Sequence, residues 1–214
     1  MATLRALSPF ALAGILGPLC FTVLVIVEGM LSPDYSHVRL PISALAAYPT
    51  GWLQRLNFYQ LGALMAFFTI GLHRAVGRTH YGGAGIGLLL LNAAGLFVAG
   101  TFSWIMVDGV PTETAPHVAG AVMAFAGAGL GLMALAPRLR TDPRWRALAT
   151  YTLATGATIL ALFVLMATLA IPDSAPLHRW VGLIQRIVVA LWFACTIALA
   201  TQMWRFGAAR TVDE

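Results

Sequence analysis

Residues 147–171 read ALATYTLATGATILALFVLMATLAI, a run of 25 residues without one charged side chain. A transmembrane α-helix needs about 20 mainly apolar residues, so this stretch predicts a helix that crosses a lipid bilayer. The whole chain agrees, because 59% of its residues are hydrophobic and only 10% are charged, against about 25% in an ordinary soluble domain. So little charge cannot cover a water-soluble surface, and we expect an integral membrane protein.

Five further runs of 17–26 residues also lack charge, at residues 7–27, 56–72, 82–107, 118–137 and 187–204. Together they predict an all-α fold, a polytopic bundle of six transmembrane helices that forms one domain over residues 1–214. The last run reaches back to Trp180 only if Arg186 is accepted inside the helix.

The basic residues predict the orientation of the bundle. All 13 are arginines, and they lie between the apolar runs without forming a basic stripe, which argues against nucleic-acid binding. Because cytoplasmic loops are enriched in arginine, we expect both termini in the cytoplasm and the chain in the cell's inner (plasma) membrane. The predicted cytoplasmic set is Arg5, Arg74, Arg78, Arg138, Arg140, Arg144, Arg146, Arg205 and Arg210, and the predicted external set is Arg39, Arg55, Arg179 and Arg186.

The first external connection, residues 29–55, is long and half apolar, which predicts a short interfacial helix between helices 1 and 2. Small residues at helix-packing spacing predict close helix contacts. These pairs are Gly83 with Gly87, Gly127 with Gly131, and Ala13 with Gly17.

Charged groups at the membrane boundary mark the candidate site, since such groups are costly there. Glu28, Asp108, His117 and Arg186 come from four helices at a similar depth near the external side. We expect Arg186 to reach Glu28 or Asp108, with one carboxylate as acid or base, Arg186 as anion clamp and His117 as relay. The substrate-binding candidates around them are His37, Arg39, Ser43, Thr112, Trp104, Trp180 and Gln185.

The same residues have a structural interpretation, in which an ion pair of Arg186 only fixes the register of the helices. The spacing of the histidines matches no metal site, and the sequence contains no phosphate loop or dinucleotide fingerprint. We therefore expect no metal and no cofactor.

Three short motifs resemble the DUF998 family of bacterial six-helix membrane proteins. They are Ile42-Ser43-Ala44-Leu45, the stretch with Asp108, Thr112, Thr114 and His117, and the group Gly182, Gln185 and Arg186. In that family an acidic residue often follows the serine, whereas Ala44 stands here. The resemblance covers essentially the whole chain and implies the topology and a shared polar cluster, without a substrate.

The leading functional hypothesis is an externally open pocket that binds, and acts by acid/base chemistry on, a lipid-soluble small molecule. Membrane lipids are its expected surroundings. A polyprenyl-like ligand could be stabilised by cation-π contact with Phe97, Phe102, Trp104 and Trp180. The alternative is a non-enzymatic scaffold or accessory subunit, and a transporter ranks last because no charge lies near the bilayer midplane.

Overall fold

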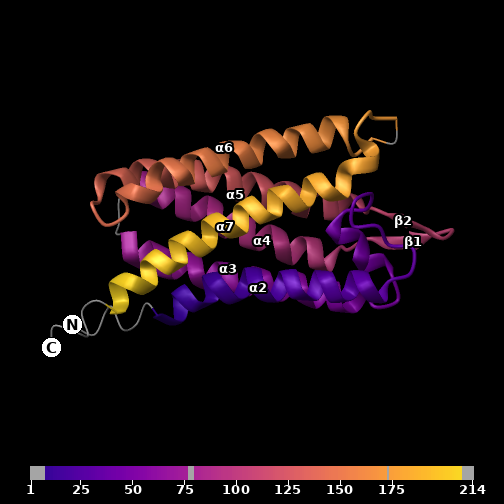
Figure 1. Cartoon of the computed structure of the whole chain (residues 1–214), viewed down its shortest axis with the longest axis horizontal. Coiled ribbons are helices and arrows are strands. Elements are labelled where there is room, and N and C mark those ends of the chain that lie inside the picture. The colour runs from indigo at the N-terminus through magenta and orange to yellow at the C-terminus, as the bar shows by residue number, and fades with distance from the viewer. Residues whose placement is uncertain (1–7, 77–79, 173, 209–214) are drawn as a thin grey trace.

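The computed structural model describes residues 8–76, 80–172 and 174–208. Long α-helices run side by side along the molecule (Figure 1), and two short 3-10 helices and one β-hairpin gather at one end, which we call the hairpin end. The long helices are α2 (Ser8–Leu31), α3 (Gly51–Val76), α4 (His80–Thr101), α5 (Ala115–Thr141), α6 (Arg146–Leu169) and α7 (Val181–Ala208). The short elements are η1 (Ile42–Ala47), β1 (Ile105–Val107), β2 (Val110–Thr112) and η2 (His178–Trp180).

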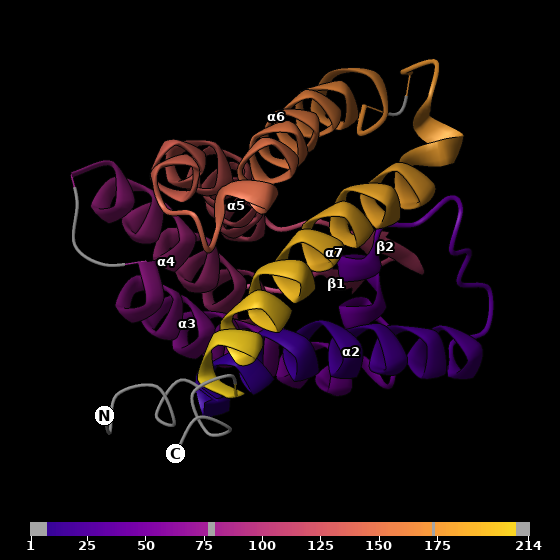
Figure 2. The same ribbon diagram turned by 60° about the vertical axis from the view of Figure 1, so that its left-hand side comes forward.

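The helices form a closed ring in sequence order. Each long helix packs against the next one in the chain, and α7 closes the ring by packing against both α6 and α2. Figure 2 shows α7 passing obliquely from α2 to α6. A ring of this kind has an interior that every helix can line.

Within the described residues, five helical segments are long and apolar enough to cross a membrane, as the composition predicts: Pro9–Leu31, Gly83–Thr101, Ala115–Thr141, Arg146–Leu169 and His178–Phe206. The helix α3 is of similar length but carries polar residues, so it is not among them. Two of these, Gln54 and Asn57, are fully buried. The all-α membrane fold is therefore confirmed, with five spans supported by hydropathy.

The predicted helix over residues 82–107 is wrong at its C-terminal end. The helix α4 stops at Thr101, and the following residues form the β1–β2 hairpin. Its two-residue turn is Asp108-Gly109, with φ of 49° and 79°, which is the backbone conformation that favours Asp-Gly in tight hairpins. Asp108 therefore stands exposed at a hairpin tip and does not end a helix.

A short helix occupies the predicted segment between α2 and α3, in the form of η1. Five of its six residues are buried, and it packs against α2, α3, α7 and both strands. It therefore fills the hairpin end of the ring from within the protein.

Close backbone contacts hold α5 to both of its neighbours. A Cβ atom placed on Gly127 would lie 2.6 Å from the backbone nitrogen of Asn92 in α4, and one on Gly156 in α6 would lie 2.6 Å from the Gly129 carbonyl oxygen in α5. The predicted close approach at Gly127 is thus confirmed. Gly83 and Gly87, by contrast, face open space, so the predicted contact at this pair is wrong.

Candidate functional site

A cavity of about 490 Å³ opens at the hairpin end. One side is polar and comes from the segment before η1, the hairpin and the start of α5, while the other is apolar and comes from α5 and α6. We call it the outer cavity. Its polar wall residues are Arg39, Ser43, Trp104, Thr112, Glu113, His117, His178 and Gln185.

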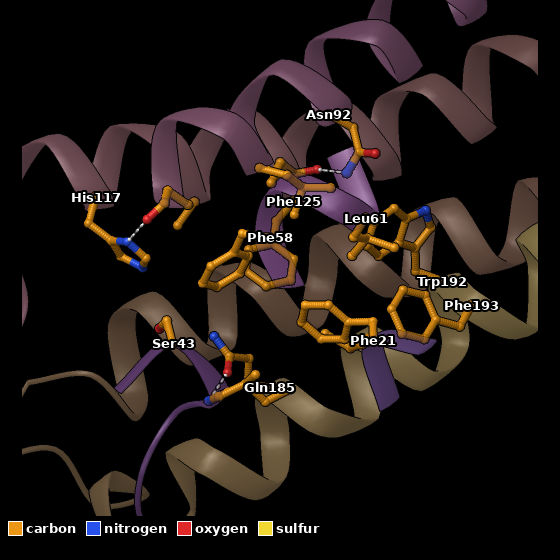
Figure 3. A pocket seen from close by; sticks show the side chains of 16 residues that line it. Phe21, Ser43, Phe58, Leu61, Asn92, His117, Phe125, Gln185, Trp192 and Phe193 are labelled. Carbon is orange, nitrogen blue, oxygen red and sulfur yellow. Dashed lines mark hydrogen bonds between the residues drawn. The ribbon is translucent and has the colours of Figure 1, made fainter. Parts of the chain in front are cut away.

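A second cavity of about 50 Å³ lies deeper inside the ring and is lined almost entirely by apolar side chains, with Phe21, Phe58, Trp192 and Phe193 among them. Figure 3 shows Phe21, Trp192 and Phe193 toward one end of it, and His117, Ser43 and Gln185 toward the other. We call it the inner cavity. Five residues line both cavities and define a neck between them: Ser43, His117, Ala121, Phe125 and Gln185.

His117 is oriented at this neck by the backbone of α4. Its Nδ1 lies 3.0 Å from the carbonyl oxygen of Ala99, and because a carbonyl only accepts, Nδ1 must carry the proton. The neutral ring therefore presents a bare Nε2, which lies 3.9 Å from a carboxylate oxygen of Glu113. Nε2 and the carboxylate oxygen are both acceptors, so they attract each other only when one of the two groups carries a proton.

Glu113 precedes α5 and is partly buried in the wall of the outer cavity. Burial raises the pKa of its carboxyl above the usual value, and the nearby indole N–H of Trp104, which makes no hydrogen bond at ordinary distance among the described residues, opposes this rise. The carboxyl thus keeps its proton to a higher pH than an exposed glutamate does, which suits it to sharing that proton with His117.

Gln185 and Ser43 complete the neck. The backbone N–H of Ile42 donates a 2.6 Å hydrogen bond to Oε1 of Gln185, which fixes the side-chain amide so that its Nε2 points toward the cavity (Figure 3). Ser43 is buried in η1 and lines both cavities. The neck therefore offers a hydroxyl, an amide NH₂ and an imidazole from three different elements.

Arg186 is satisfied without a carboxylate. Its Nη2 donates to the Tyr35 hydroxyl at 2.6 Å and to His37 Nδ1 at 3.0 Å, while Nη1 donates to the carbonyl oxygens of Leu40 at 3.1 Å and Gly182 at 3.0 Å. Among the described residues no carboxylate oxygen lies within ion-pair distance of Arg186. The predicted pairing with Glu28 or Asp108 is wrong, because carbonyl and side-chain acceptors already use these donors.

Glu28 lies elsewhere in the interior. Only 1% of its surface is exposed, and neither carboxyl oxygen has a hydrogen-bond partner at ordinary distance among the described residues. Its carboxyl faces the backbone N–H of Gln54 in the first turn of α3, where the helix dipole favours negative charge. Tyr35 lies close enough to Glu28 and Arg186 to be influenced by both charges, so the phenol is near both of the residues expected to pair.

The remaining candidates divide between the outer cavity and other places. Arg39, Trp104 and Thr112 line the outer cavity, whereas Asp108 and Trp180 line neither cavity. Of the aromatic residues proposed for cation-π contact, Trp104 lines the outer cavity, whereas Phe97, Phe102 and Trp180 are absent from the walls of these two cavities.

Two residues of this region escaped the sequence analysis. Glu113 stands four residues before His117, the spacing of one helical turn, and this was an available signal. Tyr35 lies 151 positions from Arg186 in the chain, so no spacing rule could have joined them.

These features define a multi-pass helical membrane protein with a cavity at the hairpin end of its helix ring. A family model described as "Protein of unknown function (DUF998)" matches residues 15–202, and the chain belongs to this family. No curated protein and no solved structure matches it.

Proposed function

We propose that this chain crosses the membrane six times, and that its outer cavity binds a lipid-soluble molecule with which the Glu113–His117 pair exchanges a proton. The sixth span is α3. Its buried face holds Gln54 and Asn57, which lower its mean hydropathy, whereas Leu56, Phe67 and Ile70 are exposed on its outer face. A helix with this division can face lipid on one side and the interior of the ring on the other.

The distribution of arginine supports an external hairpin end. Arg138, Arg140, Arg144 and Arg146 surround the α5–α6 connection, at the end of the ring opposite the hairpin. The positive-inside rule then places that end in the cytoplasm. The predicted cytoplasmic set also contains Arg5, Arg78 and Arg210, which lie outside the described residues.

The apolar side of the outer cavity supports a lipid-soluble ligand. Val118 and Val122 of α5 and Ile171 after α6 line it, and each is more than two-fifths exposed. This wall therefore continues to the apolar outer surface of the helices, where lipid chains would lie. A ligand could enter from the membrane and meet the polar neck at its inner end.

The single observation that carries the chemical part of the proposal is the 3.9 Å approach of His117 Nε2 to the Glu113 carboxylate in the cavity wall. The Ala99 carbonyl fixes the tautomer, so one proton can be held at a defined place beside a bound molecule. Acid/base catalysis requires such a positioned proton within reach of the ligand.

The test of ligand binding compares two variants of α5 that each replace an alanine by phenylalanine. Ala121 lines both cavities at the neck, whereas Ala119 is exposed and lines neither. Protein purified in a mild detergent is extracted with organic solvent, and the extract is analysed by mass spectrometry. We expect a lipid-soluble species in the wild type and in Ala119→Phe that is depleted in Ala121→Phe. Identical extracts from all three proteins would instead favour the scaffold hypothesis.

The scaffold hypothesis has its own support in the Arg186 group. Four hydrogen bonds to protein acceptors engage both terminal nitrogens of Arg186, and this residue lines neither cavity. Arg186 therefore fits a structural role, fastening the loop before η1 to α7, while the Glu113–His117 pair fits a functional one.

A further inference from the structure

The hydrogen-bonding groups of the neck indicate which chemical group a ligand would present there. Of the two ends of the Gln185 amide, only the oxygen can accept the hydrogen bond from the Ile42 N–H. The NH₂ group must therefore be the other end, and it faces the cavity as a donor (Figure 3). No partner for this NH₂ is found among the described residues. This NH₂ borders the open space of both cavities, so an acceptor on a ligand can bond to it there.

Ser43 adds a second group of the same kind. Its side chain is 4% exposed, lines both cavities and makes no hydrogen bond to another described residue. Its hydroxyl can therefore donate to the same ligand atom as Gln185. Two donors from η1 and α7 that face one small space suit an oxygen with two lone pairs.

The charges around the neck are not arranged to hold an ionic head group there. Both terminal nitrogens of Arg186 already donate to protein acceptors, and Arg39, the arginine that lines the outer cavity, is exposed. An anion at the neck would lack a buried cation and would lie near Glu113. A cation would be attracted by Glu113, but at the neck it would face the N–H donors of Gln185 and gain no acceptor from them.

The surroundings on both sides of the neck are apolar. The inner cavity, at about 50 Å³ with Phe21, Phe58 and Phe193 in its wall, has room for a small hydrocarbon group only. The outer cavity continues along Val122 of α5 and Phe163 of α6, where a long chain would fit.

We propose that the ligand is a neutral lipid whose carbonyl oxygen, in a ketone, quinone or ester, accepts hydrogen bonds from Gln185 Nε2 and Ser43 Oγ. A short apolar end of the ligand fills the inner cavity, and its longer chain follows α5 and α6 through the outer cavity. This inference rests on the proposed function, because it names the class of molecule that the same site holds.

The test uses four probes with the same straight alkyl chain and different heads: dodecan-2-one, dodecanoate, dodecyltrimethylammonium and dodecane. The protein is held in lipid nanodiscs, and the apparent affinity is taken from the rise in melting temperature with probe concentration. We expect the ketone to bind at least about tenfold more tightly than dodecane, as one or two neutral hydrogen bonds would give.

Two variants locate the effect at the neck. Ser43→Ala removes a hydroxyl that makes no described hydrogen bond, and Gln185→Glu keeps the oxygen for Ile42 N–H while removing the NH₂. Each should weaken ketone binding by about three- to tenfold and leave dodecane unchanged. Thr168→Ala is the control, because this hydroxyl bonds to the Val164 carbonyl on the exposed side of α6.

The outcomes separate the two proposals. If dodecanoate, dodecyltrimethylammonium or dodecane binds as well as the ketone, or if both neck variants bind the ketone like the wild type, the carbonyl assignment is overturned while ligand binding stands. If none of the four probes shifts the melting temperature, binding at the outer cavity itself is overturned.

Discussion

His117 Nε2 and a carboxylate oxygen of Glu113 lie 3.9 Å apart across one turn at the start of α5. Burial holds the pKa of Glu113 above its usual value of 4.5, so the folded protein keeps a proton that the unfolded chain releases. Stability contributed by that proton is present at low pH and is lost as the pH rises from 4.5 through the raised pKa.

We predict that Glu113→Gln removes this loss of stability at rising pH. The amide has no proton to release, so the melting temperature of the variant should fall less than that of the wild type as the pH is raised from 4.5. Thermal unfolding in nanodiscs over a pH series measures the difference. Parallel profiles for the two proteins would show that Glu113 titrates in the same way in both states.

His37 should give the opposite dependence. Burial, and after it the Arg186 guanidinium, hold the pKa of His37 below its usual value of 6.5, and its Nδ1 must stay unprotonated to accept from Arg186. The stability that neutral His37 contributes is therefore fully present above pH 6.5, and it is lost as the pH falls from 6.5 through the lowered pKa. In His37→Gln, whose amide oxygen can still accept, the decline should be absent. A decline of equal size in the variant would assign it to another group.

Arg186→Lys should destabilise the fold although it keeps the charge. An ammonium group cannot reach the four acceptors that the two guanidinium nitrogens bond, and hydrogen bonds to charged groups contribute about 1.5–3 kcal/mol each. We expect a loss of about 2–4 kcal/mol in the free energy of unfolding. Arg55→Lys, at an exposed arginine of α3, is the matched control and should change little. Equal melting temperatures for the two variants would refute the packing role of Arg186.

The two helix glycines Gly127 and Gly87 give a matched pair for packing. A side chain at Gly127 would collide with the α4 backbone, whereas one at Gly87 would meet open space. We predict that Gly127→Leu lowers stability by about 1–3 kcal/mol or more, while Gly87→Leu stays within about 0.5 kcal/mol of the wild type. Thermal unfolding of both variants checks the contrast. Similar melting temperatures would mean that α4 and α5 separate without cost.

The proposed orientation can be checked with single cysteines. After replacement of Cys20 and Cys195, a cysteine at Asp108 should react with a membrane-impermeant reagent in intact cells, and one at Arg140 should react only after lysis. Asp108 is a suitable position because it is exposed at the hairpin tip. Labelling of the Arg140 position in intact cells would reverse the topology.

The helices were predictable because the bilayer sets their length and excludes charge, and residues 147–171 correspond to α6 within two residues at its C-terminal end. The end of α4 was not predictable in this way, because Ile105, Met106 and Val107 are as apolar as the helix before them. The Asp108-Gly109 turn was the usable signal for the hairpin, and hydropathy alone does not register it.

The candidate site was predictable in part. His117, Ser43 and Gln185 were selected for their polarity near the membrane boundary, and all three line the neck. The partners of Arg186 were not predictable, because every residue has a carbonyl oxygen and only the fold selects that of Leu40 among them. Depth along a helix restricts the partners of a charge without identifying them.

The contact between Gly156 and Gly129 has a mechanical consequence. It fixes α6 to α5 at mid-length, and α6 continues from there to the hairpin end, where Phe163, Met166 and Ala167 form part of the cavity wall. Beyond Gly156 the second half of α6 is held by side chains, with Phe163 stacked on Phe125 of α5 and Met166 packed against Val181 of α7. A bulky occupant of the outer cavity would have to displace these side chains, whereas the backbone contact at Gly156 would stay fixed, so the firmness of this packing would set the largest guest that the protein admits.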